Sequence, residues 1–153
     1  MNHWLMKCEP EAYSIDDLKR DKKIQWEGVR NYQARNYMKN DMRIGDKVLF
    51  YHSDADPSGV AGVAKVCREA YPDPFSWNPK SKYFDPKSTE ANPRWWMVDI
   101  CFVEKLPRIV SIGEMRNYAE LADLMILQKG SRLSITPVTR PQFDFILKLA
   151  KAR

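Results

Sequence analysis

The sequence Lys47-Val48-Leu49-Phe50-Tyr51-His52 is typical of a β-strand, because it is rich in β-branched and aromatic residues and has turn residues on both sides. Gly45-Asp46 marks a turn immediately before it. The polar segment 53–59 follows and leads into a second run of strand-like composition, residues 60–67. The two runs together predict a β-hairpin.

Elements of the same kind continue outward from this hairpin. Residues 3–7, 95–103 and 133–138 have strand-like composition, and a helix is predicted at residues 32–40. Three more helices are predicted by capping boxes, in which a hydroxyl residue is followed three positions later by an acid or amide. These boxes are Ser14 with Asp17, Ser111 with Glu114 and Thr139 with Gln142, which precede runs to Lys23, Gln128 and Lys151. Short strands interleaved with short helices, without a repeated βαβ unit, favour an α+β fold with a small curved or closed sheet and helices at its rim.

Residues 70–94 differ from the rest of the chain. Five prolines in this segment argue against a regular element. Its aromatic residues, which include Tyr71, Phe75, Trp77, Tyr83 and Phe84, indicate that it packs onto something and does not extend freely into solvent.

The length of 153 residues fits one domain, residues 1–153, and 44% hydrophobic content is enough for a core. The formal net charge is +5. Counted by thirds, it is +2 over residues 1–53, −2 over 54–104 and +5 over 105–153. If the fold joins the two ends, they form one basic face suited to a polyanion. The alternative is scattered solubilising charge.

Composition also bears on location and on the cysteines. No run approaches the ~18 apolar residues of a membrane span, and the first residues lack the apolar region of a signal peptide. We therefore expect a cytoplasmic protein in a bacterium or a nuclear one in a eukaryote. Cys8, Cys67 and Cys101 are odd in number and far apart, which predicts small core residues and neither a disulfide framework nor a zinc site.

Conventional catalytic and cofactor motifs do not occur in the sequence. The only histidines are His3 and His52, and His52-Ser53-Asp54 cannot form a relay because neighbours in a strand point to opposite faces. There is no glycine-rich phosphate loop and no metal-ligand spacing. We expect no catalytic residue, no metal and no cofactor.

The most informative segment is residues 26–36, WEGVRNYQARN, which concentrates amides, arginines and aromatic rings around one glycine. Asn31, Gln33 and Asn36 could recognise a base edge, Arg30 and Arg35 could hold phosphate, and Trp26 offers a stacking surface. The alternative is that these amides and arginines cap backbone groups at the start of a helix.

The sequence resembles the EVE domain family over nearly its whole length. The blocks that carry the resemblance, in order, are WLMKCEP from Trp4, WEGVRNYQARN from Trp26, FYHS from Phe50, GVAG from Gly59, AYPD from Ala70, Val98-Asp99 and RLSI from Arg132. Two positions depart from the family pattern. Trp95-Trp96 stands where relatives often have one aromatic, so either ring could face the pocket, and Thr136 stands where a glutamine is frequent.

The resemblance implies a PUA-like fold, a small β-barrel with peripheral short helices, akin to the YTH domain that binds methylated adenine in RNA. It implies binding of modified bases in nucleic acid, such as 5-methylcytosine or 5-hydroxymethylcytosine in DNA, or a modified base in RNA. A base turned out of its stack would enter a pocket whose rings offset the cost of unstacking.

We predict the binding residues on this basis. The second aromatic wall opposite Trp26 is either Trp95 or a ring of the 75–84 loop, and we expect the last third of the chain and residues 26–36 to surround the pocket. The base-binding residues are Trp26, Val29, Asn31, Tyr32, Tyr51, Ser53 and Trp95. The phosphate-binding residues are Lys7, Arg30, Arg35 and Arg132.

Two other functions stay open from the sequence. One is a small-molecule or protein interaction module. The other is an enzyme acting on modified nucleotides, for which only Glu9, Glu27 and His52 could supply an acid or base. If the chain only binds, a protein partner must supply any downstream activity.

Overall fold

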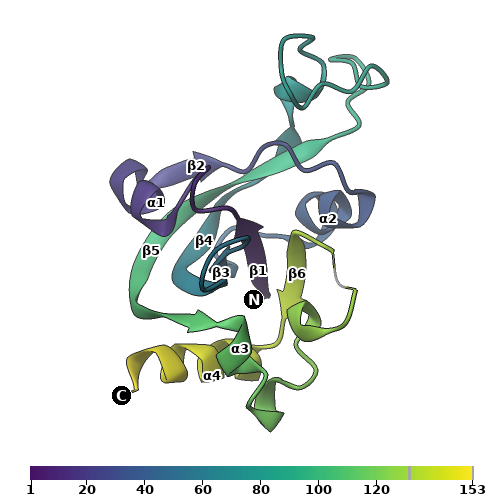
Figure 1. The fold of residues 1–153 in the computed structure, drawn as a ribbon. Coiled ribbons are helices and arrows are strands. Elements are labelled where there is room, and N and C mark those ends of the chain that lie inside the picture. Colours follow the sequence, from purple (N-terminus) through teal and green to yellow (C-terminus); the bar gives the residue numbers. More distant parts are fainter. Residues whose placement is uncertain (131, 153) are drawn as a thin grey trace.

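The computed structural model describes residues 1–130 and 132–152, and its centre is one six-stranded mixed sheet (Figure 1). The strands are β1 His3–Cys8, β2 Lys23–Gln25, β3 Lys47–His52, β4 Gly59–Pro72, β5 Trp96–Ser111 and β6 Ile135–Val138. Their order is β2-β5-β4-β3-β1-β6, with β1 and β3 parallel and the other neighbours antiparallel. The predicted α+β class and the β3–β4 hairpin are confirmed. Within the described residues β2 and β6 end the hydrogen-bonded order, so closure into a barrel is not confirmed.

The helices are short and lie around the sheet. They are α1 Ile15–Asp21, α2 Tyr32–Asn36, α3 Ile112–Met115 and α4 Arg140–Lys151. The capping boxes of Ser14 with Asp17 and of Thr139 with Gln142 are both formed, as predicted. The helix predicted at residues 32–40 is α2 followed by a π-helical turn, Tyr37–Asp41. None of the described helices is long and apolar enough to span a membrane.

The helix predicted from Ser111 to Gln128 is wrong in length. Ser111 does cap α3 by accepting from the Glu114 N–H, but α3 ends at Met115. Two 3₁₀ turns follow, Ala119–Leu121 and Met125–Leu127. The residues that this segment buries are not at helical spacing, so the chain must turn repeatedly to bring each one into the core.

The two long strands extend beyond their predicted ends. Strand β4 continues to Pro72, which pairs with Trp96, and β5 continues to Ser111, with several register shifts along the pair. Residues 70–72 therefore belong to a strand, although the prolines argued for an irregular segment, because Pro72 sits at the strand end where a missing N–H costs little. The three-residue strand β2 was not predicted.

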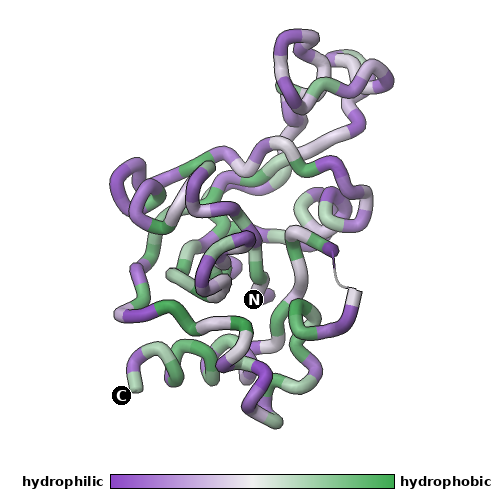
Figure 2. The backbone as a smooth tube through the Cα atoms, in the orientation of Figure 1, coloured by the Kyte–Doolittle hydropathy of each residue, from purple (hydrophilic) through white to green (hydrophobic). Residues whose placement is uncertain are grey.

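The alternation of side chains along β1 and β3 divides the core into two layers. Trp4, Met6 and Phe50 belong to a cluster that also holds residues of α1 and α2. Leu5 and Leu49 point the other way, into a cluster with α4 and the 3₁₀ turns. The strands inside the body are predominantly hydrophobic, as expected for a sheet covered on both faces (Figure 2).

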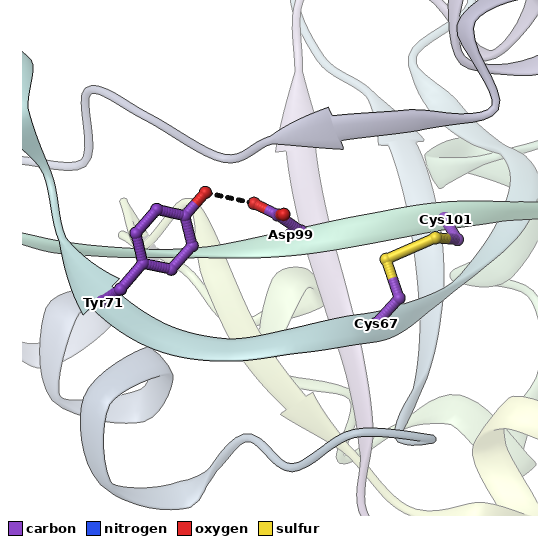
Figure 3. Close-up of a disulfide and its surroundings, with 4 residues drawn as sticks. All are labelled: Cys67, Tyr71, Asp99 and Cys101. Carbon is purple, nitrogen blue, oxygen red and sulfur yellow. Dashed lines mark hydrogen bonds between the residues drawn. A yellow bond between two sulfur atoms is a disulfide. The ribbon is translucent and has the colours of Figure 1, made fainter.

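Two cysteines are paired, contrary to the prediction of unpaired core residues. Cys67 of β4 and Cys101 of β5 form a disulfide with a Cα–Cα separation of 6.0 Å, and Cys8 is free (Figure 3). The register of β4 on β5 creates the pair, which spacing in the sequence cannot show. On the same two strands the Tyr71 hydroxyl donates to Asp99, and burial together with this carboxylate raises the pKa of Tyr71 to about 12.

The segment between β4 and β5 projects from the body (teal in Figure 1) and is mostly hydrophilic in Figure 2. It contains one 3₁₀ turn, Pro74–Ser76. Its interior is held together by the buried pair Ser76 and Ser88, whose hydroxyl oxygens are 2.8 Å apart, and by the backbone N–H of Asp85 on the Ser76 carbonyl. The prediction that this segment packs is confirmed, because Tyr83 contacts Gly28.

Candidate functional site

A cavity of about 410 Å³ lies where β1, β2, residues 26–30 and the projecting segment meet. Its aromatic wall is formed by Tyr13, Trp26 and Tyr83. Charged and polar side chains share the lining, and these are Lys7, Arg30, Lys82, Glu27, Gln25 and Ser134. A flat ligand with hydrogen-bonding edges and negative charge suits this combination of rings, cations and amide.

Trp26 is positioned by the continuation of β2 along β5. Its backbone N–H donates to the Val98 carbonyl at 2.8 Å, and its ring meets Phe50 edge to face with centroids 5.9 Å apart. The residue is only 8% exposed. Trp26 therefore belongs both to the core and to the cavity wall. A substitution at Trp26 would change the shape of the cavity and the stability of the fold together.

Tyr83 lines the cavity and packs on Gly28. Gly28 has a φ of +81°, which favours glycine, and a β-carbon at this position would lie 2.6 Å from the Tyr83 ring. Glycine is therefore required at position 28 for two reasons, the backbone conformation and the close approach of the ring. The sequence predicted a second aromatic wall formed by Trp95 or by a ring of the 75–84 loop, and of these Tyr83 lines the cavity.

A buried carboxylate holds residues 28–30 against the projecting segment. The Asp73 side chain is fully buried and accepts from the Gly28 N–H at 3.0 Å, the Arg30 guanidinium at 3.1 Å and the Phe75 N–H at 2.9 Å. Arg30 also donates from Nε to the Tyr83 carbonyl at 2.9 Å. Arg30 lines the cavity, and its Nε and Nη1 atoms donate to protein groups. Its Nη2 atom is buried without a hydrogen-bond partner among the described residues, so its two N–H groups are free to donate to a ligand.

A second predicted group lies outside the cavity. The rings of Tyr32 and Trp95 stack with centroids 4.8 Å apart, and the Arg35 guanidinium lies 4.7 Å from the Tyr32 centroid. The Trp95 indole N–H donates to Asp85 at 2.7 Å, and Arg35 donates to the Arg94 carbonyl at 2.9 Å. Neither Trp95 nor Trp96 is on the cavity wall, so the predicted pocket role of Trp95 has no support from its position.

Asn31 caps a helix, which is the alternative to base recognition that the sequence left open. Its side-chain oxygen accepts from the Ala34 N–H at 3.0 Å and caps α2. The capping contact occupies the acceptor that base recognition would use. The predicted amide contact is better supplied by Gln25, which lies on the cavity wall.

The remaining predicted residues surround the cavity unevenly. Val29 and Lys7 line it, whereas Tyr51 and Ser53 line a neighbouring cavity that also contains Lys7. Arg132 is exposed and lines neither. Of the last third of the chain only Ser134 reaches the first cavity, so the expectation that this third would surround it is wrong within the described residues.

Burial shifts the ionisation of several cavity groups. It raises the pKa of Glu27, helped by the negative charge of Asp73, and it lowers the pKa of Lys7. It also raises the pKa of the Cys8 thiol. Burial therefore disfavours the charged forms of Glu27, Lys7 and Cys8.

The three acid–base candidates do not assemble. Glu27 lines the cavity and Glu9 is exposed. The buried His52 accepts from the Ile15 N–H at 3.1 Å, and burial lowers its pKa. Among the described residues no group of three or more His, Cys, Asp and Glu side chains could hold a metal ion.

An open mixed sheet with a few short helices defines an α+β fold, and an aromatic and cationic cavity lies beside β1 and β2. The chain belongs to the EVE domain family, whose model matches residues 2–149. Human thymocyte nuclear protein 1 is 40% identical over 166 residues, which cover 97% of this chain and 73% of the human protein. The resemblance found in the sequence is confirmed.

Solved structures agree closely with this fold. A Pseudomonas syringae protein has a TM-score of 0.93 and 44% identity, covering 97% of this chain and 99% of its own. The human THYN1 protein, solved in complex with DNA that contains 5-methylcytosine, has a TM-score of 0.93 and 38% identity, covering 100% and 99%.

Several cavity residues were not assigned to a site from the sequence. They are Tyr13, Gln25, Lys82 and Tyr83. The aromatic content of residues 70–94 signalled that this segment packs, but not which ring reaches the site. Gln25 could have been suggested as a site residue, because it lies directly before Trp26 in the sequence.

Proposed function

We propose that this chain is a single EVE domain that binds nucleic acid by taking a modified base into the cavity lined by Trp26 and Tyr83, and that it catalyses no reaction. The observation that carries the proposal is the cavity itself, whose lining combines the rings of Tyr13, Trp26 and Tyr83 with cationic side chains. The human THYN1 structure with 5-methylcytosine-containing DNA supports the same ligand class for this chain.

The size and chemistry of the cavity suit a base. Its volume of about 410 Å³ lies within the roughly 300–1,000 Å³ usual for small-ligand sites. Turning a base out of a duplex costs a few kcal/mol, and stacking on an aromatic side chain returns about 1–3 kcal/mol per base. Two rings therefore offset the cost of extrusion, and Gln25 supplies the hydrogen bonds to the base edge.

Preference between bases depends on what the modification adds. A buried methyl contributes about 0.8 kcal/mol, which is roughly a fourfold preference for 5-methylcytosine. A hydroxymethyl group that gains a hydrogen bond would be distinguished more strongly. Both modified cytosines in DNA, and a modified base in RNA, belong to the ligand class proposed.

The wider setting follows from the same proposal. The domain would be of the PUA-like class and would act in bacterial cytoplasm or a eukaryotic nucleus, and a protein partner would supply any downstream activity. The proposal of binding without catalysis is supported by the separation of Glu9, Glu27 and His52.

The test compares oligonucleotides that differ at one base. Wild type, Tyr83→Ala and Phe84→Ala are titrated with matched DNA and RNA bearing cytosine, 5-methylcytosine or 5-hydroxymethylcytosine. Phe84 is the matched control, because it neighbours Tyr83 but is 41% exposed and absent from the cavity wall. Tyr83→Ala should lose about 1–3 kcal/mol of affinity for its preferred base, and Phe84→Ala should bind as wild type.

Two outcomes would overturn the proposal. One is an undiminished preference in Tyr83→Ala, and the other is chemical conversion of the modified base, seen by mass spectrometry after incubation. Trp26→Ala is a poorer test, because removing a buried tryptophan costs about 3–5 kcal/mol of folding stability.

A further inference from the structure

A second cavity, of about 450 Å³, adjoins the first at Lys7. Its cationic residues are Lys7 of β1, Arg116 after α3 and Lys129 after the 3₁₀ turn Met125–Leu127. Ser53 and Gln128 add a hydroxyl and an amide, and Asp54 is the one carboxylate in the lining. The excess positive charge of the last third of the chain is thus represented here by Arg116 and Lys129.

These three cations are not committed to other protein groups. None of them forms an ion pair with any carboxylate in the described part of the chain. Arg30 and Arg35 differ in this respect. Arg30 is paired with Asp73. Arg35 stacks on Tyr32 and donates to the Arg94 carbonyl. Unpaired cations around a cavity attract an anion. A cation that is already paired with a protein group has gained most of its electrostatic energy from that group.

The place of Lys7 connects the two cavities. Lys7 lines both cavities, and burial lowers the pKa of its ammonium, so an anion beside it would offset the cost of desolvating that ammonium. A base in the first cavity remains attached to its sugar and phosphates. The sugar and phosphates must therefore lie outside the first cavity, beside one of its edges. The edge at Lys7 leads directly to Arg116 and Lys129.

Resting on the proposed function, we propose that the phosphates flanking the bound base lie in the second cavity, on Lys7, Arg116 and Lys129. The strand then passes from one cavity to the other at Lys7. Arg116 can bind a phosphate through two parallel N–H bonds, and the lysines act as point charges. Contacts of this kind position a strand without distinguishing its bases.

The first experiment measures salt dependence with a DNA oligonucleotide containing one 5-methylcytosine. The variant is Arg116→Ala with Lys129→Ala, and the charge-matched control is Lys19→Ala with Lys148→Ala. Both control lysines are exposed and line neither cavity. The slope of log Kd against log salt should fall by about 0.7–0.9 for each lost phosphate contact in the first variant and stay at the wild-type value in the control. The ratio of affinities for modified and unmodified DNA should not change.

The second experiment separates phosphate from base. Binding of 5-methyl-2′-deoxycytidine is compared with binding of its 3′- and 5′-monophosphates. Wild type and control should gain affinity from a phosphate, and the Arg116→Ala, Lys129→Ala variant should lose that gain while binding the nucleoside equally well.

The experiments can overturn the phosphate site and the base site separately. Equal salt slopes and equal phosphate gains in variant and control would overturn the phosphate site and leave the base site standing. A wild type without preference for the modified base would overturn the proposed function, and the salt slopes on unmodified DNA would still decide whether Arg116 and Lys129 contact phosphate.

Discussion

The ring of Tyr83 rests on the Cα atom of Gly28, so closely that a β-carbon there would lie 2.6 Å from the ring. This contact joins the projecting segment to the loop that follows β2. Arg30 fastens the same junction by donating to the Tyr83 carbonyl at 2.9 Å. The rings of Trp26 and Tyr83 in the cavity lining therefore come from two distant parts of the chain, and the position of Tyr83 depends on the absence of a side chain at position 28.

Gly28→Ala should displace Tyr83 and weaken base binding. The left-handed backbone at residue 28 costs a non-glycine residue about 1–2 kcal/mol, to which the clash with the ring adds. Gly113→Ala is the control, because the nearest atom to a β-carbon there is 4.0 Å away. Titration with the modified oligonucleotide and thermal unfolding check both effects. Equal affinity of Gly28→Ala and wild type would show that the ring position does not matter for binding.

Asp73→Asn should destabilise the junction between residues 28–30 and the projecting segment. The carboxylate is fully buried against Arg30, and removing one partner of a buried ion pair typically costs about 3–5 kcal/mol. Glu90→Gln provides an exposed acid-to-amide control in the same segment. Chemical denaturation measures the difference in unfolding free energy. A change below about 1 kcal/mol would mean that the ion pair contributes little.

Stability should fall as the pH drops below about 6.5. Burial lowers the pKa of both histidines, and the Nε2 atom of His52 must stay unprotonated to accept from Ile15. Between the lowered folded pKa and the unfolded value of about 6.5, the unfolded chain binds more protons, so stability is complete above this range and declines as the pH falls through it.

Urea unfolding at about pH 7.5 and about pH 5.5 measures this dependence. His52→Gln keeps an acceptor but does not titrate, so its midpoint should change less between the two values. An identical change in wild type and His52→Gln would remove His52 from the explanation and leave the dependence to His3.

One free thiol per chain is expected under denaturing, non-reducing conditions. Cys67 and Cys101 are paired and Cys8 is free, so alkylation should modify Cys8 alone and should modify all three cysteines after reduction. Intact mass measurement counts the modified groups. Three modified cysteines before reduction would contradict the bridge between β4 and β5.

Local signals in the sequence predicted much of the fold. Lys47–His52 was predicted with both ends correct, and the caps at Ser14 and Thr139 began the helices where expected. These succeeded because a capping box or a strand flanked by turns depends on nearby residues only. Strand β2 and the ends of β4 and β5 depend on pairing with distant strands, which no local pattern records.

The candidate site divides in the same way. Trp26, Val29, Arg30 and Lys7 were predicted and line the cavity. Trp95 was misplaced because it is an aromatic residue at a strand end, and only the fold shows that its indole is bonded to Asp85 within the projecting segment. Arg116 and Lys129 carried no motif, and they gain a common role only from their position beside Lys7.

In the proposed complex the modified base leaves its stack and enters the cavity lined by Trp26 and Tyr83. The most direct test is an NMR measurement on DNA whose 5-methylcytosine carries a ¹³C-labelled methyl group. At saturation with the protein we expect the methyl resonance to move upfield, because it lies near aromatic rings, and to show nuclear Overhauser effects to Tyr83 that disappear in Tyr83→Ala. A methyl resonance that keeps its duplex position in the saturated complex would contradict the account.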